Sequence, residues 1–325
     1  MNRLIKIAIT TGDPDGIGFE VVSKALARVK PKTDIQLYLW RAPSASKKDL
    51  RRIDSTFRRR TVSSWPEALK ESVSGNKDLV DISSNLSPAH WVEISAQAAK
   101  LGHIDGIATA PLSKTAIQAA GMKDIGHTDI LKRVAKANDL FMTFVGKKFS
   151  VVLATGHISL DRVAGHLDEK CLEGAIRAAQ ELKSLLPSKD KRGVAVLGLN
   201  PHAGEEGIIG KHEQEVHNRV VERLKGSKIP VEGPLVPDAA FSEENWEKYA
   251  VFVANYHDQG LIPYKLIHKR QGVHMTMGLP FVRTSVDHGT AKDIFGKDKA
   301  DYHSMLEALK WAVDMCRAKR SEDER

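Results

Sequence analysis

The sequence predicts an α/β protein with a mostly parallel sheet. Short apolar runs of strand length alternate with longer segments in which apolar residues recur at helical spacing. Segments rich in Pro, Gly and Asn come just after several of the apolar runs, where loops follow the carboxyl ends of parallel strands. The 325 residues suffice for one large domain or two of medium size, and no repeat or low-complexity linker divides them.

The expected elements follow one another along the whole chain. The first apolar run, IKIAIT, predicts a buried strand that Gly12-Asp13-Pro14 ends. Helical spacing resumes directly afterwards. Strands are expected at 5–10, 104–108, 150–154, 194–199 and 251–254, and helices at 19–29, 169–186, 212–224 and 302–318.

The chain is basic, with 49 Lys and Arg against 41 Asp and Glu and a formal charge of +8. Its densest basic cluster, residues 47–60, has Leu50, Ile53 and Phe57 near helical spacing, which predicts a solvated helix face. Aromatic residues make up 6% of the chain, and it contains no known nucleic-acid-binding motif. We therefore expect no nucleic-acid partner, and the surplus charge is better suited to attracting a small phosphorylated anion.

The composition also indicates the compartment. Cys171 and Cys316 are too few for a disulfide framework, and they are compatible with a reducing environment. The amino-terminal residues form no signal peptide, and no apolar run approaches the ~18 residues of a membrane span. We expect a cytoplasmic protein with no membrane partner.

Three histidines follow three of the predicted strands. His157, His202 and His257 each lie shortly beyond an apolar run, so all three can leave one edge of a sheet. Three imidazole ligands that leave one coordination position of the metal open are typical of a catalytic metal site. A single histidine after a strand is more often a capping or packing residue. The carboxylate of Asp258 could orient the neighbouring imidazole.

A set of longer motifs then resembles one family, that of 4-hydroxythreonine-4-phosphate dehydrogenase in pyridoxal 5'-phosphate biosynthesis. The motifs are TTGDPDGIGFE (10–20), ATAPLSKTAIQAAG (108–121), GHTDIL (126–131), LGLNPHAGEEG (197–207), GPLVPDAAF (233–241), YHDQGLIPYK (256–265) and MGLPFVRTSVDHGTAKDI (277–294). The resemblance implies two α/β domains flanking a cleft, like those of isocitrate and isopropylmalate dehydrogenases. It implies no GxGxxG Rossmann motif, and this chain has none. We place a cofactor-side domain at 1–130 plus 280–325, and a metal, substrate and dimerisation domain at 131–279.

The resemblance also implies the chemistry. Such enzymes oxidise 4-phosphooxy-L-threonine at C3 with NAD or NADP, and decarboxylation then gives 3-amino-2-oxopropyl phosphate. One divalent metal (zinc, magnesium, cobalt or manganese) would be held by His157, His202 and His257. The partners implied are a small phosphorylated hydroxy acid and a second copy of the chain, in a homodimer with the active site at the subunit interface.

Further positions acquire roles by the same resemblance. The substrate-binding residues would be His127, Thr128, Lys265, His274 and Arg283. The cofactor-binding residues would be Gly12, Asp13, His288, Gly289, Thr290 and Ala291. For catalytic proton transfer we consider Asp238, Asp258 and Lys265.

Departures from the family pattern leave alternatives open. His274 stands where the family usually has Asn at a substrate contact, and Asp15, Phe19 and Phe295 replace small or rigid residues. The same chemistry on threonate or erythronate 4-phosphate is therefore an alternative. A metal-dependent hydrolase is another, and it differs in requiring no nicotinamide cofactor.

Overall fold

The structure is a computed structural model that describes residues 4–71, 77–187, 190–227 and 229–323. The chain forms two compact units. Unit 1 comprises Met1–Asn138 and Leu279–Arg325, and unit 2 comprises Asp139–Gly278. The boundaries predicted from the sequence lie after residues 130 and 279. Among the described residues, no helix is long and apolar enough to cross a membrane.

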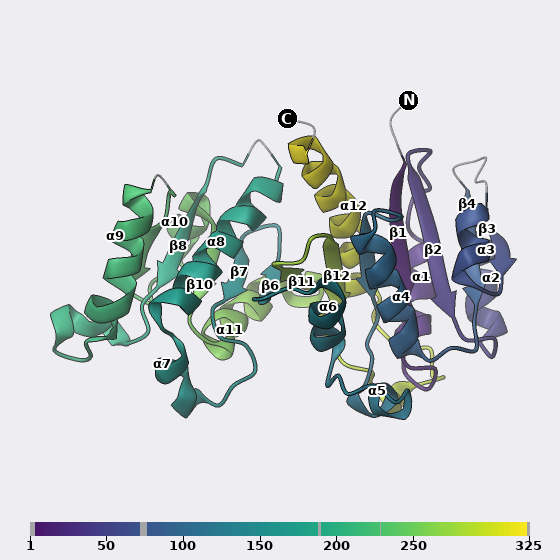
Figure 1. The fold of residues 1–325 in the computed structure, drawn as a ribbon, viewed down its shortest axis with the longest axis horizontal. Helices are drawn as coiled ribbons and strands as arrows, with labels where there is room; N and C mark the ends of the chain where they lie inside the picture. The colour runs from purple at the N-terminus through teal and green to yellow at the C-terminus, as the bar shows by residue number, and fades with distance from the viewer. Residues whose placement is uncertain (1–3, 72–76, 188–189, 228, 324–325) are drawn as a thin grey trace. The chain divides into compact units, whose positions relative to one another are not determined.

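Unit 1 is built on parallel strands in the order β3-β4-β2-β1-β5-β12 (Figure 1). The strands are β1 (Ile5–Thr10), β2 (Ile35–Arg41), β3 (Arg58–Val62), β4 (Asp78–Ser83), β5 (Gly106–Thr109) and β12 (Val282–Val286). In the central strands nearly every residue is buried, as expected for a parallel sheet with both faces covered. The alternation of strands and helices predicted this arrangement correctly.

Helices cover the unit 1 sheet. They are α1 (Gly18–Leu26), α2 (Lys47–Asp54), α3 (Trp65–Lys70), α4 (Pro88–Lys100), α5 (Lys114–Ala119), α6 (His127–Ala135) and α12 (His303–Asp323), with a short 3-10 turn, η5 (Lys292–Ile294). Helices α12 and α4 both contact β1 and β5, so they cover the strands whose loops form the unit 1 site described below. Ser87 caps α4 by accepting a hydrogen bond from the His90 amide.

The basic cluster at residues 47–60 differs from the prediction of one helix face. Helix α2 ends at Asp54, and the three arginines that follow Phe57 belong to strand β3. Phe57 is buried, and β3 pairs with β4, so the segment satisfies its backbone in the sheet. Arg58 and Arg60 form ion pairs with the buried carboxylate of Asp78. Much of this positive charge is therefore paired within the sheet edge.

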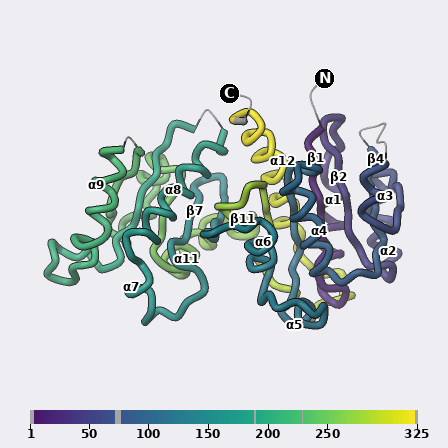
Figure 2. The backbone as a smooth tube through the Cα atoms, viewed as in Figure 1, coloured from purple at the N-terminus to yellow at the C-terminus, as the bar shows by residue number. Residues whose placement is uncertain are grey.

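Unit 2 has the strand order β11-β6-β7-β10-β8-β9, and Figure 2 traces its backbone with β7 and β11 labelled. Strands β7, β10, β8 and β9 are parallel, while β6 runs antiparallel to both β7 and β11. The strands are β6 (Phe141–Val145), β7 (Ser150–Leu153), β8 (Gly193–Leu197), β9 (Glu232–Leu235), β10 (Tyr249–Ala254) and β11 (Val273–Met277). The sheet is thus mostly parallel, as the sequence predicted.

The unit 2 helices pack around an aromatic core that includes Phe149, Phe252 and Tyr264. Helix α8 contacts β7, β8 and β10, and α11 contacts β7 and β10. The elements are η1 (Leu160–Arg162), α7 (Val163–His166), α8 (Glu169–Leu185), η2 (Pro201–Gly207), η3 (Glu213–His217), α9 (Asn218–Gly226), α10 (Glu243–Lys248), α11 (His257–His268) and η4 (Lys269–Gln271). The helix predicted at 212–224 is divided, because η3 is a π-helical turn that leads into α9.

Candidate functional site

In unit 2, three neighbouring parallel strands end at one edge of the sheet. Strand β10 lies between β7 and β8, with Ala254 opposite Leu153 and Val253 opposite Val196. The carboxyl ends of parallel strands meet at the same sheet edge, which is where ligands bind in open α/β folds. The segments that contain the three candidate histidines follow these strands directly.

Two of these histidines lie side by side. The ring centroids of His157 and His257 are 5.2 Å apart, at an interplanar angle of 44°. Nδ1 of His257 is 2.6 Å from Oδ1 of Asp258, so this carboxylate can hold the Nδ1 proton and leave Nε2 available to a ligand. In the described ranges, no three His, Cys, Asp or Glu side chains are close enough to hold a metal ion. The structure therefore brings two of the three candidate ligands together and does not group His202 with them.

The segment around His202 has an unusual backbone. Residues 202–206 all have positive φ, with values of 52°, 51°, 84°, 45° and 53°. Only Gly204 in this run is a glycine, and each L-residue in a left-handed conformation costs roughly 1–2 kcal/mol. Such conformations persist only where the surrounding contacts determine them. This run was not predicted, because the sequence pattern here indicates only a glycine-containing turn.

The other predicted unit 2 residues lie in different surroundings. Lys265 is exposed on α11, and Asp238 is exposed in the turn that follows β9. His274 is on β11 opposite Phe144, and the two rings stack with centroids 5.1 Å apart. His274 is thus partly packed against an aromatic side chain.

In unit 1, loops that follow β1, β5 and β12 form a second cluster. The carboxylate of Asp13 accepts a hydrogen bond from the Ser113 amide at 3.0 Å. Gly12 has φ of +68°, and a Cβ there would be 1.9 Å from the carbonyl oxygen of Pro111, so only glycine fits. The Ile17 amide donates to the carbonyl of the last of these loops, at residue 290. The predicted cofactor-binding segments at 12–13 and 288–291 are therefore connected through the backbone.

A cation further ties these two segments together. Nζ of Lys292 is 2.7 Å from Oδ2 of Asp15 and 3.6 Å from Oδ2 of Asp13. Asp15 is one of the departures from the family pattern, and the structure gives it this ion-pair partner. Among the described residues, Oδ2 of Asp13 and Nε2 of His288 are buried and accept or donate no hydrogen bond. Oδ2 of Asp13 is therefore held by the ion pair with Lys292, while Nε2 of His288 is a buried ring nitrogen without a hydrogen bond to the described residues.

Two predicted substrate-binding residues of unit 1 have lowered pKa values, and the charge of Arg283 contributes to the lowering at His127. Arg283 is only 2% exposed, and its Nη2 donates to Oγ1 of Thr109 at 2.9 Å. Burial lowers the pKa of Arg283 to about 9. Burial, and then the nearby charge of Arg283, lower the pKa of His127 to about 3, so this imidazole is neutral at pH 7. His127 and Thr128 form the first turn of α6, whose amino-terminal dipole favours anions. A buried guanidinium beside a helix amino terminus is suited to an anionic group.

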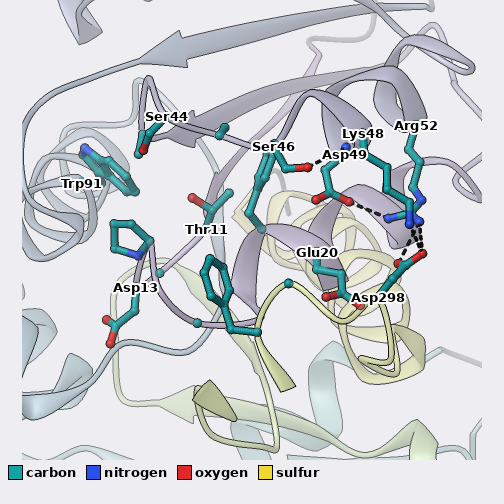
Figure 3. A pocket seen from close by; sticks show the side chains of 18 residues that line it. Thr11, Asp13, Glu20, Ser44, Ser46, Lys48, Asp49, Arg52, Trp91 and Asp298 are labelled. Atoms are coloured by element: carbon teal, nitrogen blue, oxygen red, sulfur yellow. Dashed lines mark hydrogen bonds and ion pairs between the residues drawn. The ribbon is translucent and has the colours of Figure 1, made fainter. Parts of the chain in front are cut away.

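A pocket of about 200 Å³ adjoins Gly12 and Asp13 in unit 1 (Figure 3). Its lining includes hydroxyl groups of Thr11, Ser44 and Ser46 and the aromatic rings of Phe19, Trp91 and Phe295. Its charged lining residues are Asp13, Glu20, Asp49, Asp298, Lys48 and Arg52. Figure 3 shows the two cationic side chains directed at Asp298, with N···O distances of 2.5 and 2.7 Å. Two departures from the family pattern, Phe19 and Phe295, thus line one pocket.

Comparisons with known proteins identify the family of the chain. Residues 53–312 match the family described as the pyridoxal phosphate biosynthetic protein PdxA. The chain is 35% identical to 4-hydroxythreonine-4-phosphate dehydrogenase of Sulfurihydrogenibium sp., over 98% of this chain and 100% of the relative. It is 33% identical to D-threonate 4-phosphate dehydrogenase of Pectobacterium atrosepticum, over 95% and 98%. The crystal structure of 4-hydroxythreonine-4-phosphate dehydrogenase from Klebsiella pneumoniae superposes with a TM-score of 0.80 at 31% identity, covering 97% of this chain and 98% of that one.

Proposed function

The chain belongs to the family of the pyridoxal phosphate biosynthetic protein PdxA, whose members compared above are dehydrogenases, and from this premise we propose its reaction. The enzyme oxidises the C3 hydroxyl of 4-phosphooxy-L-threonine, with NAD or NADP as hydride acceptor. The resulting β-keto acid loses carbon dioxide and gives 3-amino-2-oxopropyl phosphate. The observation that supports this most directly is the sheet edge of unit 2, where β7, β10 and β8 present three histidine-bearing segments together.

We assign one divalent metal to His157, His202 and His257. Imidazoles suit zinc, cobalt and related ions, and the pairing of two of these rings on one sheet edge fits such a donor set. When bound, the metal would supply a Lewis acid for the oxidation and the decarboxylation. Asp258 accepts a hydrogen bond from the protonated Nδ1 of His257 and so fixes the tautomer in which Nε2 carries a free lone pair for a metal.

In unit 1, Arg283, His127 and Thr128 bind an anionic group of the substrate. The buried guanidinium supplies charge and a rigid set of donors, which suit a phosphate or a carboxylate. The neutral imidazole of His127 has one donor and one acceptor, so it adds a hydrogen bond without adding charge. Together these groups fix the position of the substrate relative to the hydride acceptor.

Two exposed groups of unit 2 are assigned to proton transfer and anion binding. Lys265 lies on α11, two turns beyond His257, and its exposed ammonium can bind an anion or donate a proton. Asp238, in the turn after β9, is our second candidate acid or base.

We assign the unit 1 pocket to the nucleoside part of the cofactor. Four carboxylates and two cations line it, so its formal charge is −2, which disfavours a phosphate group. Carboxylates can accept hydrogen bonds from ribose hydroxyls, as they do in other NAD sites. Its volume of about 200 Å³ is below the ~300 Å³ of small complete ligand pockets, so only part of a dinucleotide fits.

A homodimer is part of the proposal. Several large apolar side chains of unit 2 are strongly exposed, including Ile208 at 84%, Leu160 at 69% and Leu266 at 69%. Exposed apolar side chains of this size are candidates for a subunit contact, because apolar surface patches mark interaction sites. Sedimentation of the wild type and of an Ile208→Glu variant tests whether these residues contribute to a dimer contact.

A second substrate is supported by one specific residue. His274 replaces the usual Asn, and D-threonate 4-phosphate has a hydroxyl where the first substrate has an amino group. A neutral imidazole has one donor and one acceptor, so its hydrogen bonds to a substrate amino or hydroxyl group differ from those of an asparagine amide. The relative from Pectobacterium, named for D-threonate 4-phosphate, matches this chain over nearly its whole length.

The test is a turnover panel with both phosphorylated acids and with NAD and NADP, each with and without added divalent metal. We expect metal-dependent formation of reduced cofactor together with release of carbon dioxide. Product formation without cofactor reduction would instead indicate the hydrolase alternative. Reduction that is unaffected by chelation would contradict the assigned metal site.

A further inference from the structure

Asn255 connects all three histidine-bearing segments of unit 2. It is fully buried and lies two residues before His257. Its backbone carbonyl accepts hydrogen bonds from Oγ1 and the amide of Thr155, at 2.6 and 3.1 Å, two residues before His157. Its side-chain Nδ2 donates to the Leu197 carbonyl at 2.9 Å, at the end of the strand that leads to the third histidine. One side chain and its own backbone therefore join β7, β10 and β8 just where each strand ends.

Gln259 adds a second connection between two of these segments. Its Oε1 accepts a hydrogen bond from the Asn255 amide at 2.7 Å, and its Nε2 donates to the Gly198 carbonyl at 2.8 Å. The start of α11 is thereby tied to the segment that follows β8. These bonds use carbonyls and amides that lie beyond the regular sheet ladder, where backbone groups need other partners.

The π-helical turn η3 also forms hydrogen bonds with these segments, through the residues at its two ends. At its carboxyl end, His217 is fully buried and its Nε2 lies 2.9 Å from Oδ1 of Asn255. Because Nδ2 of Asn255 donates to a carbonyl, Oδ1 must be the acceptor, so Nε2 of His217 carries the proton. The imidazole thereby fixes the orientation of the Asn255 amide.

At the amino end of the same turn, Glu213 holds the segment that leads to His202. This carboxylate is 2% exposed, and its Oε1 accepts from the amides of Leu199 and Asn200, both at 2.7 Å. Its Oε2 accepts from Nδ2 of Asn200 at 2.9 Å. The left-handed run at 202–206 follows directly, and a buried carboxylate with three donors is a strong local constraint on it.

We propose that the π turn Glu213–His217 positions the three histidine segments before any metal binds, acting through Asn255 at one end and through the Leu199–Asn200 segment at the other. Glu213, His217 and Asn255 are positioning residues, and none of them is a metal ligand. A π turn is suited to this role, since such turns are frequent at functional sites. The inference builds on the metal site of the proposed function.

The test compares two His217 variants with the wild type. His217→Leu removes the donor to Asn255, whereas a glutamine amide in His217→Gln retains one. We expect cobalt binding, followed by absorption titration of the folded protein, to weaken about 10- to 100-fold in the leucine variant. The glutamine variant should restore most of the affinity. His166→Leu is the matched control, because His166 is an exposed histidine of the same unit whose Nδ1 lies 3.0 Å from the carbonyl oxygen of Arg162, one turn earlier, and the variant should bind cobalt as the wild type does.

A second readout, made without metal, separates this proposal from the metal site. In His217→Leu we expect faster amide hydrogen exchange over residues 197–206 and 255–259, and unchanged exchange in unit 1. Weaker cobalt binding with unchanged exchange, or faster exchange with unchanged cobalt binding, would overturn the positioning role. A wild type and a His257→Ala variant with equal cobalt affinity would instead overturn the metal site. If the leucine variant does not fold, Glu213→Gln answers the same question, because it keeps an acceptor for the amides but opposes the Asn200 Nδ2 with a donor.

Discussion

Replacing Arg283 with methionine should separate stability from activity. Burial lowers the pKa of this guanidinium to about 9, and at about 1.4 kcal/mol per pKa unit the lowering from its ordinary value corresponds to about 5 kcal/mol. The charged guanidinium therefore destabilises the folded state at every pH below about 9. This destabilisation decreases as the pH rises above that value. Methionine fills a similar volume without the charge. We expect the Tm of Arg283→Met to equal or exceed that of the wild type at pH 7.

The same variant should lose activity. A hydrogen-bonded cation that binds a substrate anion contributes about 2–4 kcal/mol, so kcat/KM for the phosphorylated substrate should fall roughly 30- to 900-fold. The assay is reduced-cofactor formation at several substrate concentrations, together with thermal unfolding followed by circular dichroism. Lys265→Met is the matched control for stability, because it removes the same charge from an exposed side chain and should leave Tm unchanged.

Two results would refute this reasoning. A value of kcat/KM within threefold of the wild type would show that Arg283 binds no substrate anion. A loss of activity accompanied by a fall in Tm of several degrees would show that the guanidinium stabilises the fold, and that the desolvation argument is wrong. Stability measured from pH 8 to 10 provides a further check, since only the wild type should gain stability above about pH 9 through this group.

Three further changes test other parts of the site. Gly12→Ala should weaken NAD binding at least tenfold in fluorescence titration, because its Cβ would be 1.9 Å from the Pro111 carbonyl oxygen; an unchanged Kd contradicts the cofactor assignment. Asp258→Ala should weaken metal binding about 10- to 100-fold in a chelator competition, since it removes the partner of His257 Nδ1, and a wild-type affinity would show that the 2.6 Å contact has no orienting role. His274→Asn should raise kcat/KM for 4-phosphooxy-L-threonine relative to threonate 4-phosphate, because an asparagine amide and an imidazole offer the substrate different donors and acceptors; an unchanged ratio indicates that the imidazole only packs.

Local sequence patterns were sufficient to predict most of the helices and strands and the α/β fold class. The run IKIAIT became β1 with the expected bounds, Ile5–Thr10, because a short apolar segment ended by Gly-Asp-Pro has few alternatives. The same logic failed at Arg58, which helical spacing assigned to a helix and the structure places in β3. The residues that follow α2 fit both the helical and the strand periodicity. Only the pairing of β3 with β4 decides between helix and strand there.

The sequence by itself determined the candidate ligands and their place after strands, and it determined the family through its motifs. It did not determine which strands are neighbours, and only the tertiary structure places β10 between β7 and β8 so that their loops share an edge. Nor did it reveal Asn255 or the left-handed run at His202, because a buried amide and a positive φ have no periodic signature. Periodicity records whether a residue is buried, whereas the partner of a buried polar group is chosen by contacts between residues far apart in the chain.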